Sequence, residues 1–281
     1  MTERYKYNRE GYLNEDFRMF HLRDTAGQER DFHFHDFDKL VILISGSVNY
    51  MVEAKDYTLR PWDVLLVRHH MIHKAVIDMS VPYERVIIYL DSSYIDRYAP
   101  DGSLPDCFSV AEKRRSCLVR PDGDDIPKLR SLIASMEDTA SDTELGADIL
   151  RSTQLMQLMV QLSRMMQRDT GKPDEATVYN EKIAAVLSYI NENLSKPMSV
   201  DELASMSYLS RYHFTRLFKS QTGCTVHNYI RQKRLVLGAR LIREGMSAQN
   251  AASECGFSDY SAFHRAFTST FGVSPGKIKK M

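Results

Sequence analysis

The sequence predicts a multidomain α+β protein, with an N-terminal antiparallel β-sandwich or β-barrel, a helical segment, and a C-terminal all-α domain with two helix-turn-helix units. Three observations support this: short apolar runs between turn residues from about residue 30 to 90, helical periodicity in residues 144–168, and an internal repeat near the C-terminus. Charge divides the chain similarly, because residues 1–170 carry 22 basic against 28 acidic side chains and residues 171–281 carry 15 against 9. The two halves are therefore expected to do different jobs.

The first domain is expected at residues 1–100. Runs rich in Val, Ile, Leu and Tyr begin near residues 39, 47, 63, 75 and 84, a spacing typical of a small antiparallel sandwich or barrel. Gly46 and Ser47 separate two runs as a hairpin would, and Arg60-Pro61 marks a turn before the next run.

Residues 101–168 are expected to hold a polar connection, up to about residue 125, and then a helical segment. Within 144–168 one apolar stripe is formed by Leu155, Leu158, Leu162 and Met165, and a second by Ile149, Met156, Met159 and Met166. Such a widely apolar helix needs two covering surfaces. Both can belong to the same chain, but we favour a second copy of the chain for one of them, which makes this a dimerisation segment. Residues 169–179 are polar, contain Gly and Pro, and are expected to be a linker.

The final domain, residues 180–281, contains two copies of one unit, at about 199–223 and 247–272. Ser199, Ala204, Ser205 and Ser210 align with Ser247, Ala252, Ser253 and Ser258 at an offset of 48; after one inserted residue, Phe214, Arg216, Phe218, Ser220 and Gly223 align with Phe263, Arg265, Phe267, Ser269 and Gly272 at 49. Each copy is typical of a helix, a turn and a second helix. In the first copy Ser199 with Glu202 predicts a capping box, Ser210 a second N-cap, and Gly223 a helix end.

Helical geometry then separates the two faces of each second helix. The inward side chains are expected to be Phe214, Leu217 and Phe218 in the first copy, and Phe263, Ala266 and Phe267 in the second. The candidate DNA-binding residues are Arg211, Tyr212, Thr215, Arg216 and Lys219 in the first copy, and Ser261, His264 and Arg265 in the second, with Thr268 also expected to face outward. Arg216 and Arg265 occupy the centres of the outward faces, where an arginine can contact guanine with two hydrogen bonds.

One helix from Thr225 to Arg243, ended by Gly245, is expected to join the two units, with an apolar side formed by Val226, Tyr229, Ile230, Leu237 and Leu241. Its length is roughly 28 Å, near the ~34 Å between successive major-groove segments. Residues 205–281 hold twelve Lys and Arg against three acids, which supplies charge for phosphate binding.

These motifs resemble the DNA-binding domain of AraC/XylS-type transcriptional regulators over about residues 181–280. The matching residues are Ser210, Phe214, Arg216, Phe218, Lys219 and Gly223; Tyr229, Arg234 and Leu235; Gly256, Phe257, Ser258, Asp259, Ser261, Phe263, Arg265 and Phe267; and Gly272, Ser274 and Pro275. Tyr208 departs from the pattern, because the first turn usually has Gly there, and Val226, Thr268 and Ile278 depart in smaller ways.

The N-terminal half resembles the cupin-like sensor domain of the same family through His33, His35, the strand that follows them, and His73. Cupin enzymes add a Glu four residues after the second His, but here that residue is Lys39, and Asp38 lies on the other face of the strand. We therefore expect no bound metal and no cofactor. The candidate effector-binding residues are His33, His35, Tyr50, Trp62 and His73. That these are ordinary strand residues around a filled core is an equally open interpretation.

The resemblance implies a non-enzymatic regulator, an activator in most of the family, that binds double-stranded DNA, RNA polymerase and a small-molecule effector as a homodimer. A cupin-type metalloenzyme with a DNA-binding tail and a ligandless assembly module are the alternatives. A cytoplasmic protein is expected, since the four cysteines form no CxxC pair and residues 1–10 are charged rather than apolar. The longest uncharged apolar stretch, residues 40–52, is too short to span a bilayer.

Overall fold

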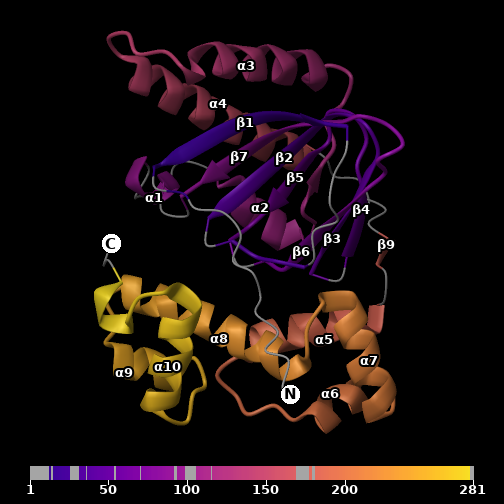
Figure 1. The fold of residues 1–281 in the computed structure, drawn as a ribbon, viewed down its shortest axis with the longest axis vertical. Helices are drawn as coiled ribbons and strands as arrows, with labels where there is room; N and C mark the ends of the chain where they lie inside the picture. Colours follow the sequence, from indigo (N-terminus) through magenta and orange to yellow (C-terminus); the bar gives the residue numbers. More distant parts are fainter. Residues whose placement is uncertain are drawn as a thin grey trace. The chain divides into compact units, whose positions relative to one another are not determined.

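The computed structural model divides the chain into two compact units, residues 1–178 and 179–281 (Figure 1). It describes residues 13, 15–25, 32–35, 37–53, 55–69, 71–91, 94–98, 106–114, 116–168, 177–178 and 181–278. Most of the expected linker, residues 169–176 and 179, lies outside the described residues.

Unit 1 contains two antiparallel sheets, as the predicted β-rich domain requires. The five-stranded sheet has the order β1 (Phe17–Asp24), β7 (Tyr83–Leu90), β2 (Asp38–Ser45), β5 (Val64–Val67) and β8 (Leu118–Val119). The four-stranded sheet has the order β6 (His73–Ile77), β3 (Val48–Val52), β4 (Lys55–Thr58) and β9 (Thr177–Val178). The five apolar runs of the sequence correspond to β2, β3, β5, β6 and β7.

Strand β2, in the middle of the five-stranded sheet, is buried on both faces, which explains its unbroken apolar run. Leu40 and Ile42 pack in a cluster with the helices of unit 1, whereas Val41 and Leu43 pack in a second cluster with the four-stranded sheet. Successive strand residues point to opposite faces, so β2 supplies side chains to both cores. The layers are therefore helices, five-stranded sheet and four-stranded sheet.

The predicted hairpin at Gly46 and Ser47 is wrong. β2 pairs with β5 and β7, while β3 pairs with β4 and β6, so the chain crosses from one sheet to the other at this point. Gly46 has φ +104°, and a Cβ there would lie 2.7 Å from the carbonyl oxygen of Pro82. A close crossing of two backbone segments, rather than a two-residue turn, requires the glycine.

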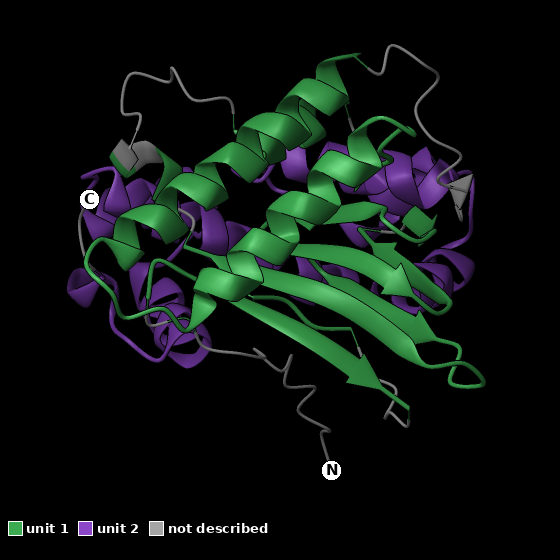
Figure 2. Ribbon diagram, turned by 90° about the horizontal axis from the view of Figure 1, so that it is seen from above, with its two compact units in different colours: residues 1–178 green, residues 179–281 purple. Residues whose placement is uncertain are grey.

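The helical part of unit 1 comprises α1 (Tyr94–Tyr98), α2 (Cys107–Arg114), α3 (Asp125–Ala140) and α4 (Ala147–Arg168). Figure 2 shows α3 and α4 lying side by side across the sheet. The segment 101–125 is more than a polar connection, because α2 buries Cys107 and Phe108, and β8 joins the sheet through Val119. Turn residues at 121–123 obscure these short elements in the sequence.

The second apolar stripe expected on α4 is largely covered within the unit. Met159 and Met166 are buried in the same cluster as Leu155 and Leu162, and Met156 is half-buried. Only Ile149 of this stripe is well exposed, at 70%. The described contacts thus remove most of the surface that we assigned to a second copy of the chain.

Unit 2 is all helical, with α5 (Glu181–Glu192), α6 (Val200–Met206), α7 (Arg211–Thr222), α8 (Val226–Arg243), α9 (Ala248–Glu254), α10 (Tyr260–Phe271) and a 3₁₀ turn (Pro275–Lys277). Helices α6 and α7 form the first helix-turn-helix unit, and α9 and α10 form the second. On α8 the fully buried side is formed by residues such as Leu235, Ala239 and Ile242, and the expected Leu237 and Leu241 are partly buried beside them. Among the described residues, no helix combines the length and apolarity needed to cross a bilayer.

Candidate functional site

The first candidate recognition helix is α7, whose ends are fixed as the sequence predicts. The Ser210 side chain accepts a hydrogen bond from the His213 amide, and Gly223 ends the helix at φ +71°. Upstream, Ser199 and Glu202 form the predicted capping box of α6. These caps satisfy amides and carbonyls that a short helix leaves without intrahelical partners.

The predicted faces of α7 are confirmed at the two phenylalanines and at the basic positions, whereas Leu217, which we expected to face inward, is only half-buried. Phe214 and Phe218 are buried, whereas Tyr212, Arg216 and Lys219 are exposed. Thr215 is half-buried, and its hydroxyl donates to a carbonyl of its own helix. A basic and aromatic surface is thus held outward by two buried phenylalanines.

Arg211, at the start of α7, is exposed, and its Nη1 lies 2.8 Å from Asp201 Oδ2 of α6. Surface ion pairs of this kind are weak, so the pair leaves the arginine available to a phosphate.

The second candidate recognition helix is α10, which begins at Asp259. Its carboxylate accepts hydrogen bonds from the amides of Ser261 and Ala262, at 3.2 and 2.8 Å, a cap that sequence reasoning did not assign. Ser261 and Arg265 are exposed. His264, which we expected to face outward, is half-buried like Thr215 of α7, and its ring lies 6.0 Å from that of Tyr260.

Thr268 also differs from expectation. We expected it to face outward, but it is half-buried, and its hydroxyl is buried with no hydrogen-bond partner among the described residues. Along α10, the rings of Phe263, Phe267 and Phe271 contact one another in turn, with centroids 5.2 and 4.5 Å apart. Thr268 follows Phe267 directly in the sequence. The exposed face of α10 is therefore narrower than that of α7.

The two units differ by one residue in the turn, where the alignment of the repeat required an insertion. Residues 207–210 connect α6 to α7, and residues 255–259 connect α9 to α10. Tyr208 has φ +55° and Gly256 has φ +85°, so both turns place a residue in the left-handed region. The departure of Tyr208 from the family pattern therefore coincides with backbone strain.

Arg234 of α8 joins the second turn to the segment that precedes α6. Its guanidinium donates to the carbonyl oxygens of Leu194, Lys196 and Gly256, at 2.8, 2.7 and 2.7 Å. A Cβ on Gly256 would lie 2.5 Å from the Leu194 oxygen. Sequence reasoning listed Arg234 only as part of a motif, because its three carbonyl partners are remote in sequence.

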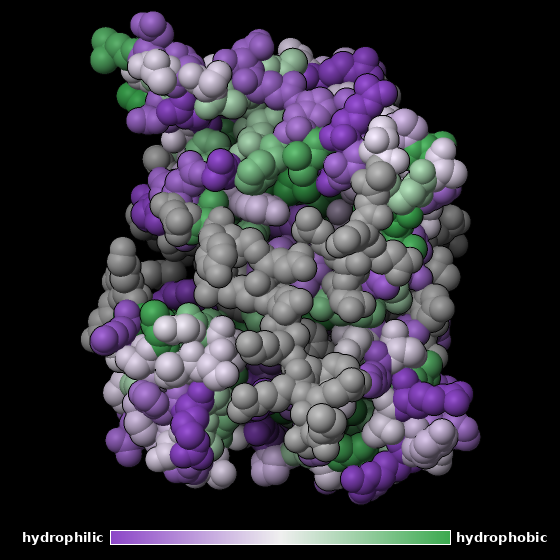
Figure 3. Space-filling view, in the orientation of Figure 1, coloured by the Kyte–Doolittle hydropathy of each residue, from purple (hydrophilic) through white to green (hydrophobic). Residues whose placement is uncertain are grey.

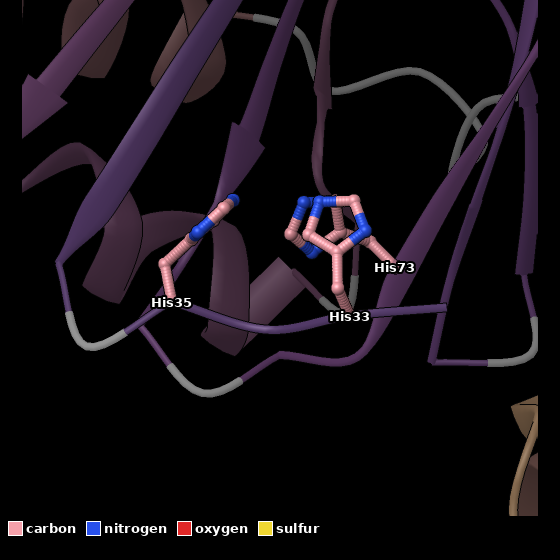
Figure 4. A group of neighbouring side chains, drawn as sticks. All are labelled: His33, His35 and His73. Atoms are coloured by element: carbon pink, nitrogen blue, oxygen red, sulfur yellow. The ribbon is translucent and has the colours of Figure 1, made fainter. Parts of the chain in front are cut away.

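Three histidines meet in the interior of unit 1. His33, His35 and His73 are 4%, 3% and 0% exposed. His33 and His73 exchange two main-chain hydrogen bonds of 3.0 Å, and the two rings have centroids 4.3 Å apart. The ring of His35 lies 5.0 Å from each of the other two. Figure 4 shows His33 and His35 projecting to the same side of their segment, toward His73.

The His73 imidazole is held neutral. Burial lowers its pKa well below the usual value, and the positive charge of Lys39 and the neighbouring His33 and His35 lower it further. Lys39 is only 7% exposed and lies on the same strand face as Val41, toward the second sheet. Asp38 is on the opposite face, where it accepts a hydrogen bond of 2.7 Å from the His69 amide.

The remaining two candidate effector residues are not placed together. Tyr50 is buried between the sheets, and its hydroxyl lies 3.3 Å from that of Tyr83. Trp62 packs instead against the core cluster on the helix side of the sheet, and the guanidinium carbon of Arg130 lies 4.9 Å from the centroid of its ring. The Trp62 amide donates a hydrogen bond to the carbonyl oxygen of Leu43. Leu43 and Lys39 lie toward opposite ends of β2. The assignment of Trp62 to the histidine site is wrong, because its turn lies at the far end of the strand.

Comparison with known proteins identifies both units. The family model described as an AraC-like ligand binding domain matches residues 19–159, and a helix-turn-helix domain model matches residues 203–281. The chain belongs to the AraC family of DNA-binding transcriptional regulators.

Its relatives include the probable transcriptional regulator LumQ of Photobacterium leiognathi, 26% identical over 91% of this chain and 94% of that protein. The transcriptional activator RhaS of Klebsiella pneumoniae is 24% identical over 88% of this chain and 87% of that protein. Among solved structures, an apo ToxT variant from Vibrio cholerae is 14% identical with a TM-score of 0.41, covering 94% of this chain and 97% of that one.

Proposed function

We propose that the protein controls transcription by placing α7 and α10 in successive major-groove segments of double-stranded DNA, with Arg216 and Arg265 reading bases. The observation that carries this proposal is that two equivalent helices each present an exposed arginine at the centre of the outward face. Helix α8, which has 18 residues, spans roughly 27 Å between the two helix-turn-helix units. The groove repeat is about 34 Å, so moderate DNA bending completes the fit.

The surrounding residues serve the DNA backbone or flank the bases. Lys219, Arg211 and Tyr212 are exposed on α7, and Ser261 is exposed on α10. Thr215 and His264 are half-buried and contribute at the edge of the contact. Because α7 has the more basic surface, it supplies the larger share of the affinity, and α10 mainly fixes position.

The test is binding of variants to operator and random DNA at several salt concentrations. Arg216→Ala and Arg265→Ala should each weaken specific binding by roughly 1–3 kcal/mol and relax preference at one base pair, the two positions lying about one helical turn apart. Lys219→Ala should weaken binding to all sequences and lower the salt slope by about one. Arg240→Ala is the matched control, since Arg240 is exposed on α8 and lies 3.6 Å from Glu244.

If Arg216→Ala lost the same affinity for every DNA sequence and kept its base preference, Arg216 would contact a phosphate and not a base. An effect of Arg240→Ala as large as that of Arg216→Ala would instead show that general positive charge, not the recognition face, determines binding.

Unit 1 serves as the sensor in this proposal, and a small-molecule effector bound between its sheets changes how two DNA-binding units are held. Polar groups buried on this side of the sheet, namely His33, His35, His73 and the Tyr50 hydroxyl, support this location. In this proposal the protein is a regulator and not an enzyme. It acts in the cytoplasm and activates transcription through RNA polymerase. Thermal-shift screening of small molecules against the full chain tests it, because a ligand of the folded state raises the unfolding midpoint.

The protein acts as a homodimer, with contact at the tip of the α3–α4 hairpin rather than along α4. Leu145, Ile149 and Leu150 are exposed there by 103%, 70% and 48%, and Figure 3 shows apolar side chains at this tip. Leu145→Glu with Ile149→Glu should convert a full-length dimer into a monomer in sedimentation at micromolar concentration. Substituting Leu155 or Leu162 is no test of assembly, since both are wholly buried in the core. A dimer unaffected by the double substitution would place the interface elsewhere.

A further inference from the structure

We propose that His33, His35 and His73 form a site for one divalent transition-metal ion of the zinc class inside unit 1. One ring nitrogen from each residue can be chosen so that all three atoms lie within 4.8 Å of one another, and all three residues are buried. Ligand nitrogens at about 2.1 Å from a tetrahedral ion are about 3.4 Å apart. The rings therefore need to move by about an ångström to bind.

The hydrogen bonding of His73 prepares it as a ligand. Its Nδ1 lies 3.0 Å from the carbonyl oxygen of Met71, which can only accept a hydrogen bond, so Nδ1 carries the proton. Nε2 then carries the lone pair, and this atom is buried with no hydrogen-bond partner among the described residues. A histidine that donates one ring N–H to a carbonyl and offers the other nitrogen to an ion is the usual arrangement at protein metal sites.

The backbone fixes the other two imidazoles relative to His73. The paired main-chain hydrogen bonds between His33 and His73 set the separation of these two residues. His35 is two residues further on, so an extended segment presents it on the same side as His33. The ring of His35 is also stacked on Phe37, with centroids 4.6 Å apart. The backbone positions of the ligands are thus set before an ion arrives, and only the rings need to adjust, which lowers the cost of binding.

The donor set indicates which ions bind. Three imidazole ligands suit Zn²⁺, Co²⁺, Ni²⁺ and Cu²⁺, whereas Mg²⁺ and Ca²⁺ require oxygen ligands. Lys39 argued against a metal in the sequence because it occupies the place of a carboxylate. In the structure its positive charge opposes an ion but removes none of the three imidazoles. We therefore expect a weaker site than one with a carboxylate, with a fourth position open to water or an anion.

An ion at this position would connect the segment 33–35, before β2, to the start of β6. The expected consequence is added stability of unit 1, because binding to the folded state favours folding. The inference concerns the interior already proposed for the sensor, but it does not depend on DNA binding. Its tests use no DNA, so its failure and the failure of the proposed function are distinguishable.

The experiment begins with the purified full chain, stripped with a chelator and titrated with Co²⁺. We expect a visible absorption band that saturates at one ion per chain, without the thiolate charge-transfer band of a cysteine-ligated ion. Zn²⁺ should displace Co²⁺ and abolish the band. At about 100-fold excess over its dissociation constant, Zn²⁺ should raise the unfolding midpoint of unit 1 by roughly 5–10 °C.

Variants assign the site. His73→Ala and His33→Ala should each weaken Co²⁺ binding by more than about 100-fold, since loss of an outer partner alone typically weakens it 10–100-fold. His69→Ala, at a histidine that lies 2.7 Å from Asp38 instead, is the matched control and should bind as the unaltered protein does. Lys39→Met should tighten binding by about 10-fold or more, because it removes a neighbouring positive charge. Far-UV circular dichroism checks the folding of each variant.

Three results would overturn the proposal: no saturable Co²⁺ band in the unaltered chain, a band that survives in folded His73→Ala protein, or equal losses in His69→Ala and His33→Ala. If the histidine variants fail to fold, Lys39→Met still decides, because weaker or unchanged binding in that variant would place the ion away from the histidines.

Discussion

Gly256→Ala tests whether the second helix-turn-helix turn is locked against the segment that precedes the first unit. The left-handed φ of +85° would strain an alanine by about 1 kcal/mol. The new Cβ would also lie 2.5 Å from the Leu194 oxygen and 2.9 Å from Arg234 Cζ. Forcing these atoms apart costs roughly a further 1–3 kcal/mol, so the free energy of unfolding of unit 2 should fall by about 2–4 kcal/mol.

Gly272→Ala is the matched control. Gly272 ends α10 at φ +73°, and a Cβ there meets nothing within 4 Å. Only the backbone strain of about 1 kcal/mol remains. The difference between the two substitutions therefore isolates the cost of the close approach at Gly256.

The assay is urea unfolding of the full chain followed by two signals. Trp62 is the only tryptophan of the chain and belongs to unit 1, so its fluorescence reports that unit. Far-UV circular dichroism includes the all-helical unit 2. Gly256→Ala should move the circular dichroism transition to lower urea and leave the Trp62 transition in place. Equal effects of Gly256→Ala and Gly272→Ala would refute the reasoning, because steric contact would then contribute nothing.

Two further predictions concern strain and thiols. Tyr208→Gly should raise the free energy of unfolding of unit 2 by roughly 0.5–1 kcal/mol, because it relieves the backbone strain at φ +55° and removes a side chain that is 90% exposed. A lower free energy of unfolding in the same urea assay would show that the tyrosine side chain contributes packing. Burial raises the pKa of Cys117 and Cys255 to about 11 and that of Cys224 to about 12, so at pH 8 these groups stay protonated. A disulfide reagent should therefore react slowly with the native chain, in which Cys107, Cys224 and Cys255 are buried and Cys117 is half-buried. All four thiols should react in denaturant, and fast native labelling of more than one thiol would contradict the burial of the other three.

Local signals made most of unit 2 predictable. The caps at Ser199, Ser210 and Thr225 and the inward phenylalanines depend on residues within one or two helical turns. The repeat gave a second instance of the Ser199 cap, at Ser247, and of the inward phenylalanines. Asp259 and Arg234 escaped assignment for different reasons. The extra residue shifted the cap of α10 by one position, and the carbonyl partners of Arg234 are set only by tertiary structure.

Unit 1 was less predictable because its short strands depend on distant partners. β8 is two residues long and pairs with β5, more than fifty positions earlier. Gly46 is typical of a hairpin turn in sequence, yet it marks a crossing between sheets. The second stripe of α4 shows the same limit, since amphipathic periodicity identifies apolar faces but not the element that covers Met159 or Met166.

The length of helix α8 sets both the distance and the rotation between the two helix-turn-helix units, and this constrains how the DNA-binding unit can change in evolution. Each residue added to a helix lengthens it by about 1.5 Å and turns everything beyond it by about 100°. A single insertion in α8 would therefore point the exposed face of α10 away from the duplex, whereas about seven residues would nearly restore the angle and extend the helix by roughly 10 Å, or three base pairs. In the binding mode that we propose, a change at Arg216 or Arg265 alters one base contact at a time. Under that proposal, operator spacing can change only in coarse steps, while operator sequence can change one base pair at a time.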